Sequence, residues 1–164
     1  MYPTQYHIVL YGKYAQGRRM QVSEEDFDRV AFRGWYVMKT GYAATTVNGK
    51  NVTAQRFILN PPPGVEVDHR NGDKLDNRRF NLRTCTKSQN NMNRYSYEGT
   101  SSQYKGVSWN KEKNSWEAFI TKDKKLHKVG YFKEERHAAM ARDMFAGLLH
   151  GEFARLNFTP VCNI

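Results

Sequence analysis

The sequence predicts an α+β protein made of two parts, and two patterns lead to this fold class. In the first part, short strand-like runs at 65–69 and 81–85 flank a loop rich in Asn, Asp and Gly, which predicts a hairpin. A polar run at 87–93 then predicts a helix. In the second part, runs between 104 and 132 predict a three-stranded antiparallel sheet, and a helix is expected from about 134 to 149.

A polar segment separates the two parts. Residues 95–103 include Gly, Ser and Thr, which is typical of a linker. We therefore expect a first domain over 1–94, with its strand–loop–strand–helix motif at about 64–94, and a second domain over 104–159.

The segments ahead of the hairpin predict a scaffold without catalytic residues. Ser23 precedes three acidic residues and is expected to cap a short helix. A second short helix is expected to end at the prolines that begin at Pro61. Strands are expected at 5–12, 35–38 and 42–47.

The expected C-terminal helix is amphipathic. Ala138, Ala141, Phe145 and Leu148 recur at helical spacing, so we expect them to form its buried stripe. The alanines would let the helix lie close to the sheet.

Composition favours a nucleic-acid partner. The net charge is +10 and the pI is about 9.7, which points to a polyanion. No apolar run approaches the ~20 residues of a membrane span, and residues 1–5 do not begin a secretory signal, so we expect a cytoplasmic protein. Cys85 and Cys162 are the only cysteines. They form no Cys-x-x-Cys zinc pair, and we do not expect a disulfide.

The side chains around the hairpin suit phosphodiester hydrolysis. His69 ends the first strand, and a neutral imidazole can take a proton from water at cellular pH. Asp68 is an anionic oxygen ligand suited to Mg²⁺ or Mn²⁺. Asn90, or Asn93 on the same helix face, can supply a neutral oxygen ligand. Asn81 begins the return strand.

Together, these residues resemble the HNH (ββα-metal) nuclease motif. The resemblance implies that a metal ion bound by Asp68 and Asn90 assists cleavage of duplex DNA, with His69 as the base. It favours Asn90 over Asn93 by offset, and it implies that Asn81 orients His69 or braces the loop. It also implies a free-standing phage enzyme, often a homing endonuclease, in the cytoplasm of the host cell.

The C-terminal part resembles an AP2 DNA-binding domain. The resemblance is carried by the runs at 104–107, 129–132 and 151–158. It implies that the sheet lies in the major groove of DNA. By position, the groove-facing residues would be Lys105, Ser108, Asn110, Thr121 and Lys128. Near the expected active site, Arg70, Arg78 and Arg79 are further candidates for DNA contact.

These observations predict a metal-dependent DNA endonuclease that is targeted by its AP2-like domain. With one active site per chain, it would nick one strand. Two alternative functions remain open. The first is that of a sequence-specific DNA-binding protein whose nuclease site is inactive, and the second is that of an RNA-binding protein. The narrow, deep major groove of A-form RNA disfavours the second.

Overall fold

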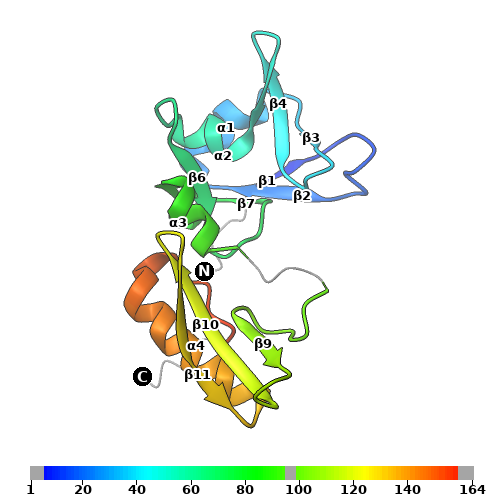
Figure 1. Ribbon diagram of the computed structural model, residues 1–164. Coiled ribbons are helices and arrows are strands. Elements are labelled where there is room, and N and C mark those ends of the chain that lie inside the picture. Colours follow the sequence, from blue (N-terminus) through cyan, green and yellow to red (C-terminus); the bar gives the residue numbers. More distant parts are fainter. Residues whose placement is uncertain (1–5, 95–98, 159–164) are drawn as a thin grey trace, which may run out of the picture. The chain divides into compact units, whose positions relative to one another are not determined.

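The computed structural model describes residues 6–94 and 99–158. The chain divides into two compact units, Met1–Lys87 and Ser88–Ile164, and each is considered by itself (Figure 1). This boundary falls earlier than the expected linker, of which 95–98 lie outside the described residues. The predictions about residues 1–5 and about Cys162 also concern residues that the structure does not describe. The division into nuclease and DNA-binding domains stays a prediction.

The first unit contains three small sheets and two helices. Strands β1 (Tyr6–Val9), β2 (Arg19–Val22) and β7 (Asp76–Asn77) form one sheet, in which β2 and β7 run parallel. Strands β3 (Tyr36–Val37), β4 (Ala43–Val47) and β5 (Lys50–Thr53) form the second. The third pairs β6 (Glu66–His69) with β8 (Leu82–Cys85). The helices are α1 (Glu24–Ala31) and α2 (Ala54–Leu59), and a 3₁₀ turn spans Arg79–Asn81.

Most expected elements of this unit are confirmed, but three strands were missed. Strand β5 was not expected, and it pairs antiparallel with β4. Strand β2 was not expected because Arg19–Val22 is short and follows a glycine-containing turn. Strand β7 lies inside the segment expected to be a loop, and it forms only because its two residues pair with Gln21 and Val22. Strand β7 therefore depends on tertiary pairing, whereas β2 also pairs antiparallel with β1.

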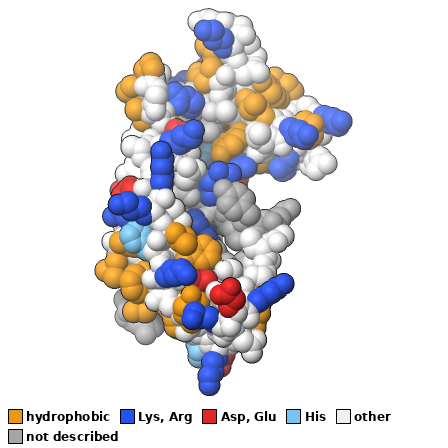
Figure 2. Space-filling model, viewed as in Figure 1, with side chains coloured by type: hydrophobic (Ala, Val, Ile, Leu, Met, Phe, Trp, Pro, Cys, Tyr) orange, Lys and Arg blue, Asp and Glu red, His pale blue; other side chains and the backbone are white. Residues whose placement is uncertain are grey.

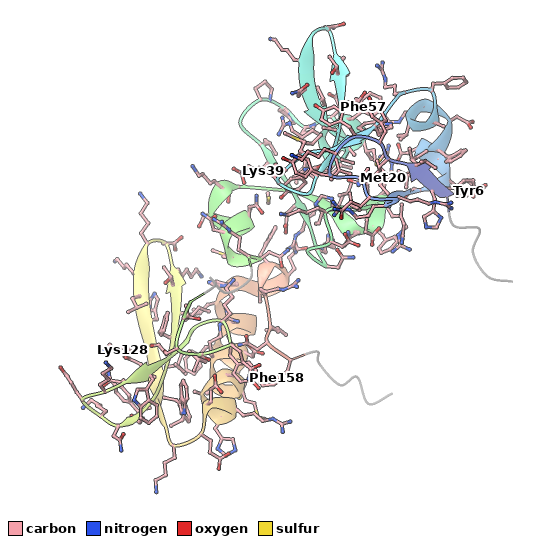
Figure 3. The ribbon with its side chains drawn as sticks, turned by 90° about the vertical axis from the view of Figure 1, so that its right-hand side faces the viewer. Tyr6, Met20, Lys39, Phe57, Lys128 and Phe158 are labelled. Carbon is pink, nitrogen blue, oxygen red and sulfur yellow. The ribbon has the colours of Figure 1, made fainter. Side chains whose placement is uncertain are left out.

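One apolar core joins these elements. Met20, Val30 and Trp35 are almost completely buried in it, and Figure 3 labels Met20 within the first unit. The Trp35 indole Nε1 donates a hydrogen bond of 2.8 Å to the carbonyl oxygen of Val30. The core thereby fixes the end of α1. It also includes Leu82, the first residue of β8.

A buried carboxylate ties α1 to the segment that precedes β8. Asp26 is fully buried, and it accepts hydrogen bonds from Arg29 and from Arg79, whose Nε lies 2.7 Å from Oδ2. Burial by itself would raise the pKa of Asp26, but the bonds from the two guanidinium groups outweigh it and lower the pKa. Ser23 holds the cap position, yet its Oγ accepts from the backbone N–H of Arg79 instead of capping α1.

We expect Asp26→Asn to lower the free energy of unfolding at pH 7 by about 2 kcal/mol, because it removes the buried carboxylate that two half-exposed guanidinium groups share. Since the folded-state pKa is lowered, this stabilisation is present above the unfolded-state pKa near ~3.9 and is lost as the pH falls through the folded value. Urea denaturation of both proteins at pH 7 and pH 3 measures the effect. Asp28→Asn is the matched control, because Asp28 is exposed on the same helix. An equal loss in this control would contradict the prediction.

The second unit contains α3 (Lys87–Met92, which begins at the unit boundary) and a three-stranded antiparallel sheet. The sheet has the order β11 (Lys125–Phe132), β10 (Ser115–Lys122), β9 (Val107–Asn110). Helix α4 (Glu135–His150) packs across one face, and a 3₁₀ turn (Gly151–Phe153) follows it (Figure 1). The expected three strands and helix are confirmed, although β9 begins later than the run at 104–109.

The buried stripe of α4 differs from the expected one. Ala138 is buried as expected and Ala141 is half-buried, but Phe145 and Leu148 are exposed, Leu148 by 83%. The residues of α4 that are buried instead are Ala138, Ala139, Arg142, Ala146 and His150. Hydrophobicity alone misplaced the stripe, because the buried face carries an arginine and a histidine. In the described part of the chain, no helix has the length and apolar character needed to cross a membrane.

Candidate active site

The β6–β8 hairpin places Asp68 and His69 at the end of a strand. Asp68 lies opposite Arg83, and His69 lies opposite Leu82. Both site residues are buried, with 7% of Asp68 and 4% of His69 exposed. The hairpin therefore brings a carboxylate and an imidazole together as expected.

Asp68 is held by a buried ion pair. Arg83 donates from Nε and from Nη2 to Oδ2 of Asp68, over 2.9 and 2.7 Å. Both side chains are more than nine-tenths buried. In a buried pair of this kind, removing one partner leaves the other charge uncompensated.

Asn77 orients the imidazole of His69. Its Nδ2 faces the carbonyl oxygen of Lys74 at 3.4 Å, so its Oδ1 is the atom that faces Nε2 of His69 at 3.1 Å. An amide oxygen only accepts, so Nε2 must carry the proton. In the neutral ring, Nδ1 is then the basic nitrogen.

The surroundings of His69 also set its charge. Burial lowers the pKa of His69 below its ordinary value, although the Asn77 bond and the carboxylates of Asp68, Asp73 and Asp76 act in the opposite direction. A lowered pKa keeps the ring neutral near pH 7, which is the state required of a general base.

Asn81 braces the loop between the strands. Its Oδ1 accepts from the backbone N–H of Asn71 at 3.0 Å, and its Nδ2 donates to the carbonyl oxygen of Asp76 at 2.7 Å. The Asn71 side chain in turn donates to the Asp76 carboxylate. Of the two roles expected for Asn81, this geometry matches the brace, while Asn77 contacts His69.

The ligand set expected for a metal ion combines a carboxylate with an amide oxygen. No group of three or more His, Cys, Asp or Glu side chains is placed to hold a metal within residues 6–94 and 99–158. The Asp68 carboxylate and an Asn oxygen are hard donors, so their chemistry fits Mg²⁺ or Mn²⁺. Asn90 lies on α3 in the second unit, and its role as a ligand stays a prediction.

The arginines expected to contact DNA differ in their surroundings. Arg70 is exposed. Arg78 forms two bonds of 2.7 Å with Asp76, and Arg79 is paired with Asp26 and Glu25. Phosphate contacts by Arg78 and Arg79 would therefore compete with carboxylates of the first unit.

Four of the five residues expected to face the DNA groove share one face of the β9–β11 sheet. Ser108 lies opposite Glu117, and Lys128 lies opposite Phe119, two positions further along β10. Asn110 and Thr121 share this face by alternation. Glu117 also stands there and bonds Lys128 at 3.0 Å; Figure 3 labels Lys128 on the side away from α4. Lys105 lies apart, beside α3.

Comparisons with known proteins identify the family. The HNH endonuclease family model matches residues 60–92. An uncharacterized HNH endonuclease of Acanthamoeba polyphaga mimivirus is 34% identical over 142 residues, which is 83% of this chain and 73% of that protein. Protein 3.8 of Escherichia phage T7 is 30% identical over 96 residues, which is 57% of this chain and 77% of that protein.

The buried Asp68–His69 hairpin and these matches define a nuclease of the HNH class. The chain belongs to the HNH endonuclease family. The family implies DNA as the substrate, and HNH nucleases generally depend on a divalent metal ion. The resemblance of residues 104–159 to AP2 domains stays a prediction.

Two residues of the site were missed in the sequence. Asn77 was counted as turn chemistry, because nothing in the local pattern shows that β7 pairs with β2. Arg83 lies in the expected return strand at 81–85, and no role in the site was expected for it. The register of the expected hairpin could have indicated the partner of Arg83, because it places Arg83 opposite Asp68.

We expect Asn77→Ala to lower the DNA cleavage rate about tenfold, because His69 loses the acceptor that fixes its tautomer. Cleavage assays and ¹⁵N NMR of the imidazole nitrogens measure the effect. Asn81→Ala is the comparison, since it removes loop bonds but leaves the Asn77–His69 contact in place. An unchanged His69 tautomer in Asn77→Ala would show that Asn77 does not act through the imidazole.

Proposed function

We propose that this protein is a metal-dependent endonuclease that hydrolyses a phosphodiester in duplex DNA and nicks one strand per active site. The observation that carries the proposal is the buried His69, whose Nε2 is directed to Asn77 and which directly follows Asp68. The printed name of the mimivirus relative, an HNH endonuclease, supports the same activity.

In the proposed mechanism, His69 Nδ1 takes a proton from the attacking water while the neutral ring is held by Asn77. Asn81 keeps the loop between β6 and β8 in shape. Asp68 and Asn90 would hold Mg²⁺ or Mn²⁺. When bound, such an ion supplies charge stabilisation for the scissile phosphate and the departing 3′ oxygen.

The second unit would hold the DNA through its AP2-like sheet. One face of the sheet is turned away from α4, and it carries Ser108, Asn110, Thr121 and Lys128. In the proposed complex, this face would lie in a groove of the duplex. Figure 2 shows Lys and Arg side chains on the surface of both units, as expected for a protein that contacts phosphates.

One observation favours the alternative of a DNA-binding protein with an inactive nuclease site. Arg83 already neutralises Asp68, so a metal ion would compete with a guanidinium. Nicking of supercoiled DNA in Mg²⁺ or Mn²⁺, compared with EDTA, separates the two functions. Metal-dependent conversion to open circles supports the nuclease. Tight DNA binding without cutting, on DNA that carries the target, supports the alternative.

A further inference from the structure

A pocket of about 490 Å³ lies within the second unit. Its walls come from α3, from residues 105–108, from the end of β10 and from the C-terminal half of α4. The volume is that of a small-molecule site. The charged side chains in its lining are Arg94, Lys105, Asp123, Lys124 and Arg142.

Arg142 is built into the wall of this pocket. Only 1% of it is exposed, and its Nη1 donates to Asp143 and to the carbonyl oxygen of Arg155. Gly106 makes room for it. A Cβ at Gly106, where φ is +73°, would lie 3.0 Å from Arg142 Nε and 2.5 Å from the carbonyl oxygen of Phe119. The buried Nε has no hydrogen-bond partner in the described part of the chain.

Lys105 brings a second, half-buried cation to the pocket. Its Nζ donates to the carbonyl oxygens of Met92 and Arg94, each at 2.5 Å. An ammonium has three N–H groups, so these two bonds leave one donor. Burial is the largest cause that lowers the pKa of Lys105, and together with the charges of the nearby Arg142 and Arg94 it brings this pKa to about 8.

His150 adds an unpartnered nitrogen. Its Nε2 lies 3.0 Å from the carbonyl oxygen of Thr121, so Nε2 carries the proton. The buried Nδ1 is therefore an acceptor, and it has no donor partner in the described residues. Burial lowers the pKa of His150, and Arg142, Lys105 and Lys122 repel additional positive charge there.

The lining of the pocket carries more cations than carboxylates. Arg142 is balanced by Asp143, but both hydrogen bonds of the Lys105 ammonium go to main-chain carbonyls. The only carboxylate in the described lining is that of Asp123, and Lys124 stands next to it. Withdrawing a cation from water without a carboxylate beside it is costly. An oxyanion that accepts N–H bonds from Lys105 and from the unpartnered Nε of Arg142 would offset this cost.

We propose that this pocket binds a phosphate group, taken either from a nucleic-acid strand or from a free nucleoside monophosphate. Ser108 and Thr121, which were expected to face the DNA groove, also line the pocket, so a strand on that sheet face would pass its opening. The proposal does not depend on nuclease activity, and the test below uses binding alone.

The test is isothermal titration of the full chain in EDTA with three probes. The probes are inorganic phosphate, thymidine 5′-monophosphate and a short DNA duplex. We expect a phosphate-bearing probe to bind, and Lys105→Met to weaken its binding about tenfold or more, the usual effect of losing a charge-assisted hydrogen bond. Lys133→Met is the matched control, because Lys133 is exposed in the same unit and does not line the pocket.

The pattern across the probes decides the source of the phosphate. Binding of the two small probes that depends on Lys105 supports a free phosphate or monophosphate, and the same dependence with the duplex alone supports a strand. If Lys105→Met does not fold, Lys124→Met replaces it, because Lys124 is exposed at the pocket. A threefold or greater loss in that variant supports the proposal. No binding, or losses that equal those of Lys133→Met, overturns it.

Discussion

Replacing His69 by alanine is expected to lower the rate of metal-dependent DNA cleavage by about 10²–10⁴-fold, the usual contribution of a general base. The reason is geometric. His69 is the buried imidazole of the hairpin, its Nε2 is directed to Asn77, and its lowered pKa keeps it neutral near pH 7. Conversion of supercoiled plasmid to open circles in Mg²⁺, at enzyme concentrations above the DNA, measures the rate.

His137→Ala is the control for this experiment, because His137 is exposed on α4 and its side-chain ion pair, 3.6 Å long, is to Glu134. We expect its cleavage rate to stay within about twofold of the wild type, as is usual for exposed positions. DNA binding by His69→Ala should persist, which separates loss of chemistry from loss of folding. Cleavage that continues unchanged in His69→Ala would place the base elsewhere.

Asp68→Asn is expected to reduce both stability and cleavage. The amide cannot neutralise the buried Arg83, so the free energy of unfolding should fall by about 2–4 kcal/mol. The amide is also a weaker ligand for a hard cation, so cleavage should fall about 10²-fold and the metal concentration for half-maximal cleavage should rise. Urea denaturation and a Mn²⁺ titration of the nicking rate measure the two effects.

Asp73→Asn is the matched control for Asp68→Asn. Asp73 is exposed in the loop of the same hairpin, and its Oδ1 accepts from the backbone N–H of Leu75, a bond that an amide oxygen can also accept. Loss of stability without any change in metal requirement would show that Asp68 serves only as the partner of Arg83. That result would favour the inactive-site alternative.

The secondary structure was largely predictable because the patterns are local. Ser23 marks the start of α1, the prolines after Asn60 mark the end of α2, and the alternating runs mark β10 and β11. The exceptions are β2, β5 and β7, whose residues have no strong strand pattern. They pair with β1, β4 and β2, respectively.

The candidate site was predictable in part. Asp68 and His69 could be found because they are adjacent at the end of a strand, and Asn81 because it starts the next one. Asn77 and Arg83 contact them through pairings that join distant segments. In the second unit, Lys105 was expected on the sheet face, but the structure places it beside the buried Arg142 of α4.

The sequence by itself determined the α+β class, the Asp68–His69 pair and the basic character of the protein, because each is written in adjacent residues or in composition. Only the tertiary structure decided the partners of those residues: Arg83 for Asp68, Asn77 for His69 and Arg142 near Lys105. Hydrogen bonds and buried charges depend on which segments pack together, and packing is a property of the whole chain.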